Sequence, residues 1–139
     1  MMPALSLIIR SYNEEAHIGK LLTGIASQSI KDVEVILVDS GSTDNTVAIA
    51  ERHGARVVHI AKADFSFGRA LNRGCETANA EVLVFASAHV YPLRTDWLEM
   101  LVAPFADPQV VLSYGRQVGN AVTKFSEHQV FEAWFPPVS

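Results

Sequence analysis

The sequence is short of cysteine, of basic charge and of long apolar runs. Its single cysteine, Cys75, excludes an intramolecular disulfide and a thiolate zinc cluster. No run approaches the ~20 apolar residues of a membrane-spanning helix, and the amino terminus lacks the basic and apolar regions of a signal peptide. With 11 Lys and Arg against 15 Asp and Glu, the net charge of −4 gives no reason to expect a nucleic-acid partner. We therefore expect a cytoplasmic protein, free or peripheral to a membrane, with no transmembrane segment.

The sequence also lacks the short motifs of several enzyme classes. It has no G-x-x-x-x-G-K-[ST] loop, no G-x-G-x-x-G turn, no G-x-S-x-G elbow and no helix with paired histidines. These absences argue against P-loop nucleotidases, dinucleotide-dependent enzymes, α/β-hydrolases and zinc metalloproteases of the common signatures. A phosphoacceptor domain would need an acidic pair after its first strand and a lysine after a later one, and residues 10–12 and 114–116 do not supply them.

Apolar runs alternate with helical stripes along most of the chain. The runs at residues 4–10, 33–38, 56–60, 81–86 and 109–114 predict five strands. Helices are predicted after Asn13-Glu14-Glu15, from a cap at Ser42 or Thr43 to a stop at Gly54, along the stripe Phe67, Ala70, Leu71, Gly74, Cys75 and Ala78, and from Thr95 through Phe105. This alternation is typical of an α/β fold, with a mostly parallel sheet covered by helices on both faces. On its stripe, Cys75 is expected to pack as a small apolar core residue.

Asp39 is the leading candidate for a ligand-binding residue. It directly follows a buried strand, and ligands of open α/β sheets bind outside the carboxyl ends of the strands, where residues 11–14, 39–44 and 87–89 would converge. A carboxylate there can accept hydrogen bonds from a ribose or a base, and Tyr12 offers a ring for a base to lie against. The alternative for Asp39 is an Asx turn with Ser42 and Thr43. Asp44 is expected to serve the start of the next helix.

Two further positions suggest phosphate or metal chemistry. Arg69 shares a helical face with Asn72 and Arg73, and its guanidinium suits a diphosphate; the alternative is a solvated basic face. His89 ends the triplet Ser87-Ala88-His89 after the fourth strand. It could coordinate a divalent ion or hydrogen-bond a phosphate, and the alternative is a structural histidine.

Three segments together resemble the family 2 glycosyltransferases, which are inverting enzymes that use nucleotide sugars. The segments are LIIRSYNE at residues 7–14, VILVDSGSTD at 35–44 and RALNRG at 69–74, and the resemblance covers residues 4–115. It implies a three-layer α/β/α, Rossmann-like glycosyltransferase-A fold. It also implies a nucleoside-diphosphate sugar as donor, a glycan or lipid-linked acceptor, and a role in cell-surface polysaccharide synthesis.

The resemblance assigns roles to individual residues. It implies that Tyr12 and Asp39 contact the nucleobase, that Glu14 lies beside the nucleoside and that Arg69 approaches the diphosphate. Most relatives then carry Asp-x-Asp after the fourth strand, whose first acid helps to hold the nucleoside and whose second coordinates Mn²⁺ or Mg²⁺. Here Ser87 and His89 stand in those places. The change predicts a weakened cation site, in which a neutral imidazole suits Mn²⁺ better than Mg²⁺.

The same resemblance predicts a nucleotide-sugar-binding domain at residues 1–115 and a carboxyl-terminal extension at 116–139, which would begin an acceptor-binding half. Within the extension, residues 126–135 predict a short amphipathic helix. The late acid and base candidates are Glu127 and His128, and neither their spacing nor the resemblance assigns a catalytic residue. We therefore predict an inverting glycosyltransferase or a fragment of one; the alternative is a non-catalytic or truncated nucleotide-sugar-binding module.

Overall fold

The computed structural model describes residues 2–118, in which strands and helices alternate. The strands are β1 (Leu5–Ser11), β2 (Val33–Asp39), β3 (Arg56–His59) and β4 (Leu83–Ser87). The helices are α1 (Ile18–Ala26), α2 (Thr46–Arg52), α3 (Phe67–Thr77) and α4 (Trp97–Val102), with 3-10 turns η1 (Lys62–Asp64) and η2 (Ala103–Ala106). The chain divides into two compact units between Val102 and Ala103. The helix predicted at residues 126–135 lies outside the described residues.

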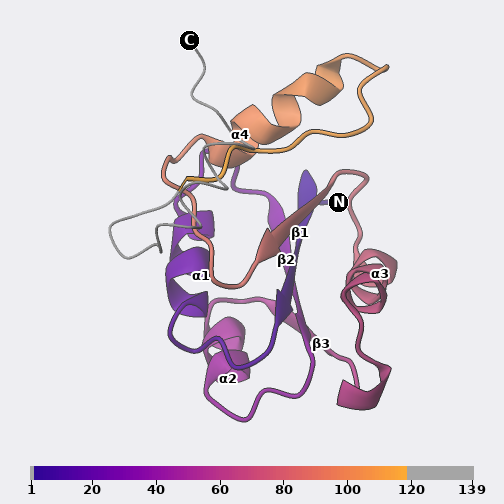
Figure 1. Ribbon diagram of the computed structural model, residues 1–139. Coiled ribbons are helices and arrows are strands. Elements are labelled where there is room, and N and C mark those ends of the chain that lie inside the picture. The colour runs from indigo at the N-terminus through magenta and orange to yellow at the C-terminus, as the bar shows by residue number, and fades with distance from the viewer. Residues whose placement is uncertain (1, 119–139) are drawn as a thin grey trace. The chain divides into compact units, whose positions relative to one another are not determined.

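The four strands form one parallel sheet in the order β3-β2-β1-β4 (Figure 1). This confirms the predicted α/β class and the first four predicted strands. The fifth predicted strand is wrong, because residues 109–114 pair with no strand in the described part of the chain. Val111 and Leu112 are instead 88% and 78% exposed. An apolar run becomes a strand only where another strand takes its backbone hydrogen bonds.

Helices cover both faces of the sheet. Because side chains alternate along a strand, Leu7 and Ile9 of β1 pack in the core shared with α1, α2 and α4, whereas Ile8 packs in the core shared with α3. Figure 1 shows α1 and α2 on one side of the sheet and α3 on the other. The fold is therefore the three-layer α/β/α arrangement that the sequence predicts.

Gly74 lets α3 approach the sheet closely. A Cβ at this position would clash with Cγ2 of Ile8 and lie 3.3 Å from Cγ2 of Val38. The neighbouring Cys75 is partly buried against the same core, which confirms its predicted packing. Phe67 was predicted on this apolar stripe but is 68% exposed. The Arg10 guanidinium lies 4.4 Å from the centre of its ring, so Phe67 meets a charged group rather than the core.

Several helix boundaries differ from the prediction. α1 begins at Ile18 rather than after Asn13, and α2 begins at Thr46 with Asn45 as its N-cap rather than Ser42 or Thr43. α4 ends at Val102, so Phe105, predicted in that helix, lies in η2. Gly54, at φ 78°, follows the end of α2, as predicted.

Candidate functional site

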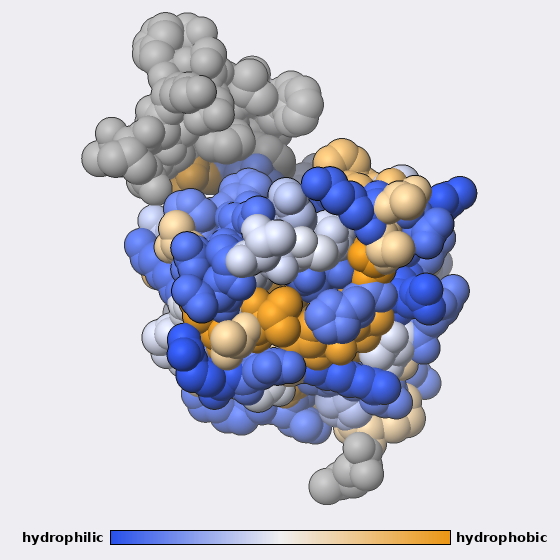
Figure 2. All heavy atoms as spheres, turned by 90° about the horizontal axis from the view of Figure 1, so that it is seen from below, coloured by the Kyte–Doolittle hydropathy of each residue, from blue (hydrophilic) through white to orange (hydrophobic). Residues whose placement is uncertain are grey.

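The carboxyl ends of the strands meet at the lower edge of the sheet in Figure 1. The parallel register aligns Ser11 with Asp39, Arg10 with Ser87, and Asp39 with His59. The loops after β1, β2 and β4 therefore leave from one edge, as predicted. The hydroxyl of Ser11 is buried there, with no hydrogen-bond partner among the described residues. Figure 2 views this side from below and shows an apolar zone bordered by hydrophilic residues.

The loops after β1 and β2 are tied together by their own side chains. Asn13 adopts φ 51°, and its Oδ1 accepts the backbone amide of Thr43 at 2.8 Å. In return, Ser42 Oγ accepts the backbone amide of Asn13 at 2.9 Å. Glu15 Oε2 accepts both the backbone amide and the side-chain amide of Asn45, at 3.0 and 2.9 Å. These side chains bond across the loops, and α1 and α2 therefore begin later than their sequence suggests.

Asp44 joins the same two loops. Its Oδ1 accepts the backbone amide of Thr46 at 2.9 Å as well as the Thr46 hydroxyl, and its Oδ2 accepts the backbone amide of Glu15 at 3.2 Å. Partial burial tends to raise the pKa of Asp44, but the hydrogen bonds from Thr46 outweigh it and hold the pKa below its ordinary value. Asp44 thus supports the start of α2 and also connects it to the loop after β1.

Asp39 uses its carboxylate within its own turn. The residue is 1% exposed; its Oδ2 accepts the backbone amides of Gly41 and Ser42, each at 3.0 Å, and its Oδ1 accepts the Ser42 hydroxyl. His59 Nδ1 lies 3.8 Å from Oδ2. This is the Asx turn that the sequence offered as the alternative, formed with Ser42 but not with Thr43. A contact between Asp39 and a nucleobase stays a prediction.

Tyr12 presents a partly exposed ring just after β1. The ring is 42% exposed, and Lys62 of η1 lies beside it, with Nζ 3.3 Å from Tyr12 Oη and 5.0 Å from the ring centre. Nothing in the sequence around Lys62 points to this contact, because Lys62 lies 50 residues from Tyr12 and no local motif marks it. Tyr12 follows β1 and Lys62 follows β3. The two residues meet because β2 alone separates these strands in the parallel sheet, so that both loops leave from the same edge.

Glu14, Ser87 and His89 come together from the loops after β1 and β4. His89 Nδ1 lies 3.4 Å from Glu14 Oε1, and the Ser87 hydroxyl lies 3.3 and 3.4 Å from the two ring nitrogens of His89. The His89 side chain is 60% exposed, and that of Glu14 is 23% exposed. The imidazole is therefore open to solvent beside a carboxylate, rather than enclosed in an apolar core.

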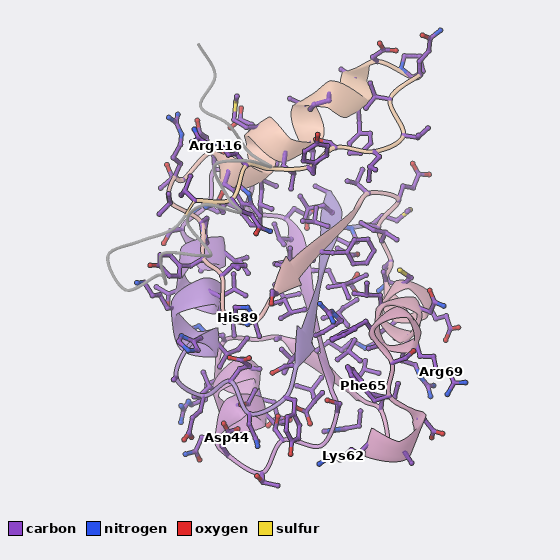
Figure 3. The ribbon with its side chains drawn as sticks, viewed as in Figure 1. Asp44, Lys62, Phe65, Arg69, His89 and Arg116 are labelled. Carbon is purple, nitrogen blue, oxygen red and sulfur yellow. The ribbon has the colours of Figure 1, made fainter. Side chains whose placement is uncertain are left out.

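Arg69 lies on the outer side of α3. Its Nη1 is 3.4 Å from the carbonyl of Asp64. Arg69 lines a shallow open depression, the other walls of which come from Ile60, Asp64, Asn72, Arg73 and Glu76. Figure 3 shows its side chain pointing away from the sheet, while His89 and Asp44 lie on the other side. Its approach to a diphosphate stays a prediction.

Comparison with known proteins decides the family. The family model described as Glycosyl transferase family 2 matches residues 6–137. The chain belongs to this family. It is 31% identical over 116 residues to the O-antigen chain rhamnosyltransferase RfbN of Salmonella typhimurium. That match covers 82% of this chain and 37% of RfbN, so the chain spans little more than a third of that relative's length.

Solved glycosyltransferase structures share the fold. One is the mannosyltransferase PcManGT from Pyrobaculum calidifontis in complex with GDP-Man and Mn²⁺, with a TM-score of 0.68 and 28% identity over 79% of this chain and 34% of that one. Another is glucosyl-3-phosphoglycerate synthase from Mycobacterium tuberculosis in complex with Mn²⁺, UDP and glucosyl-3-phosphoglycerate, with a TM-score of 0.64 and 27% identity over 76% and 40%. These likenesses confirm the Rossmann-like glycosyltransferase-A fold that the three sequence segments imply.

Both of those structures contain Mn²⁺. Within residues 2–118, no group of three or more His, Cys, Asp and Glu side chains could hold a metal ion. Glu14 and His89 offer one carboxylate and one imidazole, which suit Mn²⁺, and Ser87 adds a neutral hydroxyl. Cation binding at His89 stays a prediction.

The longest helix of the described part, α3, has 11 residues, whereas a membrane span needs about 20. Across residues 2–118, each helix is too short or too polar to cross a bilayer. The location of the protein in the cytoplasm stays a prediction.

Proposed function

We propose that the described residues form the nucleotide-sugar-binding part of an inverting glycosyltransferase. The observation that carries this proposal is the convergence of Tyr12, Glu14 and Asp39 with Ser87 and His89 at the carboxyl edge of one parallel sheet. Membership of family 2 supports it.

Each converging residue has a proposed part in binding. The exposed ring of Tyr12 stacks against the base, and the Asp39 turn positions the backbone beside it. Glu14 lies next to the nucleoside, where Thr46 Oγ1 fixes its backbone amide at 2.8 Å. Ser87 and His89 face the diphosphate from the end of β4. Arg69 lies on the other side of the sheet from His89. Its proposed contact with the diphosphate therefore requires its side chain to extend toward the carboxyl edge of the sheet.

The proposed reaction needs little from these residues beyond binding and orientation. The acceptor hydroxyl oxygen bonds to the anomeric carbon from the side opposite the diphosphate, the bond from that carbon to the diphosphate oxygen breaks, and a base takes the hydroxyl proton. Inversion follows from that direction of attack. When bound, a divalent cation offsets the negative charge on the leaving diphosphate, and Glu14 and His89 would hold it. The late candidates for the base, Glu127 and His128, lie outside the described residues.

The acceptor and the biological setting belong to the same proposal. The likeness to an O-antigen chain rhamnosyltransferase supports a glycan or lipid-linked acceptor and a role in cell-surface polysaccharide synthesis. We propose that the enzyme works on the cytoplasmic side of a membrane, where it would be free or peripheral.

Thermal unfolding with nucleotides tests the proposal. UDP, dTDP or GDP should raise the melting temperature of the chain, because a ligand that binds only the folded state stabilises it. If none of the three shifts the melting temperature, the nucleotide site is refuted. Binding without transfer or hydrolysis of any sugar nucleotide, with Mn²⁺ present and on a longer form of the chain, would support the non-catalytic module instead.

A further inference from the structure

Lys62 is fixed at the carboxyl edge of the sheet by the backbone around it. It begins η1, three residues after the end of β3, and the backbone amides of Asp64 and Phe65 close the turn onto the carbonyls of Ala61 and Lys62 at 2.9 and 3.4 Å. Figure 3 shows Lys62 at the lower edge of the molecule. The turn therefore presents a cation on the same side of the sheet as Tyr12, although the sequence gives no sign of it.

The ammonium of Lys62 keeps most of its hydrogen-bonding capacity. It donates to Tyr12 Oη at 3.3 Å, and its charge lies 5.0 Å from the ring centre, near the hydroxyl end of the ring. Among residues 2–118, no Asp or Glu forms an ion pair with Lys62. An ammonium has three N–H donors, so two remain for a ligand.

We propose that Lys62 selects the base of the nucleotide by donating a hydrogen bond to the carbonyl at position 4 of a pyrimidine or position 6 of a purine. The inference rests on the proposed function, in which a base stacks on Tyr12 and brings its edge to the hydroxyl end of the ring. Uracil, thymine and guanine carry a carbonyl oxygen where cytosine and adenine carry an amino group. The oxygen accepts from the ammonium, whereas an amino group opposes one donor with another and leaves both unpaired. Lys62 therefore favours nucleotides of uracil, thymine or guanine.

Calorimetric titration of the full chain with four nucleoside diphosphates tests this selection. The wild type should bind UDP about tenfold more tightly than CDP, and GDP about tenfold more tightly than ADP, since a hydrogen bond from a charged donor is worth at least that factor. Lys62→Met keeps the length of the side chain and removes the donors. It should weaken the binding of UDP and GDP by about tenfold and change the binding of CDP and ADP by less than about threefold. The affinity ratios of UDP to CDP and of GDP to ADP should then fall to near one.

Two variants serve as controls. Lys62→Arg keeps the donors and should preserve both preferences. Lys31→Met removes an exposed lysine that precedes β2, at the opposite end of the sheet, where its Nζ donates to the carbonyl of Ala26 at 3.0 Å. It should change neither affinity nor preference. Because both lysines are exposed, each variant should melt close to the wild type.

The titrations distinguish base selection by Lys62 from nucleotide binding itself. If Lys62→Met weakens all four nucleotides equally, Lys62 contacts the phosphates or the ribose that they share, and base selection is overturned. Equal wild-type affinities, or preferences that survive in Lys62→Met, overturn it as well. If neither these four nucleotides nor dTDP binds, the proposed function itself fails.

Discussion

The side-chain oxygen of Gln28 accepts a hydrogen bond from the backbone amide of Leu98 at 3.0 Å, so the turn after α1 holds the start of α4. The Gln28 amide nitrogen also donates to the carbonyls of Arg94 and Gly24, at 2.8 and 3.2 Å. Gln28 is 1% exposed, and this set of bonds compensates for the burial of its amide. Gln28 is therefore the buried polar side chain in this connection, and the exposed Ser29 adds hydrogen bonds to the carbonyl of Thr95 and to Glu99, each at 2.7 Å.

Replacing Gln28 with alanine should lower the free energy of unfolding by about 3 kcal/mol, because the amide of Leu98 and the carbonyl of Arg94 lose their partner in a buried setting. Equilibrium unfolding in urea measures the change. Ser27→Ala is the matched control, since Ser27 is exposed and bonds only the carbonyl of Thr23 within its own helix. It should change stability by no more than about 0.5 kcal/mol. Equal losses in the two variants would contradict the role given to Gln28.

Gly74→Ala should destabilise the fold by about 1–3 kcal/mol, even though alanine favours helices over glycine. The added methyl group would meet Ile8 and Val38 and push α3 away from the sheet. Gly68→Ala, on the same helix, is the control, because a Cβ there meets nothing within 4 Å. This variant should gain about 0.5 kcal/mol. Thermal or urea unfolding of the pair measures both changes, and a stabilised Gly74→Ala would show that the contact with Ile8 is not tight.

Asp44 makes stability depend on pH. Hydrogen bonds lower its pKa in the folded chain, so its carboxylate stabilises the fold above its unfolded pKa, and this contribution is lost as the pH falls through the folded pKa. Asp44→Asn should therefore melt below the wild type at neutral pH, and the difference should shrink as the pH falls below about 4. Melting curves across this range measure the effect. A difference that stays constant with pH would refute it.

His89→Ala should weaken UDP or GDP binding by about tenfold, because it removes a polar group that faces the proposed diphosphate. Titrations with Mn²⁺ and with EDTA distinguish two causes. If the weakening appears only with Mn²⁺, His89 acts through the cation; if it persists in EDTA, His89 contacts the diphosphate itself. His53→Ala changes an exposed histidine at the end of α2 and serves as control. No effect of His89→Ala in either buffer would remove it from the site.

The central strands β1 and β2 could be predicted because each is an apolar run that a parallel sheet buries over most or half of its length. Ile8 and Ile9 of β1 are both fully buried, one against each layer of helices. Residues 109–114 are also rich in apolar residues, yet they form no strand within the described chain. Composition specifies which segments favour burial, but it does not supply the neighbouring strand.

The candidate site was predictable only where it follows directly from the strands. Asp39 and His89 could be found because each comes just after an apolar run, and the ends of parallel strands share an edge. Lys62 could not be found, since nothing in its own neighbourhood points to Tyr12. The side chains of Asn13 and Thr43 suit a helix cap or a bridge between loops equally well, and only the distance between the two loops decides which one forms.

The hydrogen bonds between the loops after β1 and β2 need no ligand to form, because both partners of each bond belong to the chain. Asn13, Thr43, Glu15 and Asn45 hold one another before any nucleotide arrives. A ligand would thus meet a surface whose shape is already set, and little binding free energy would be lost to ordering flexible segments. Association should then be limited by encounter rather than by rearrangement. A change in which nucleotide sugar the protein binds would therefore come from side chains that project from these two loops, not from a change in the backbone of the loops.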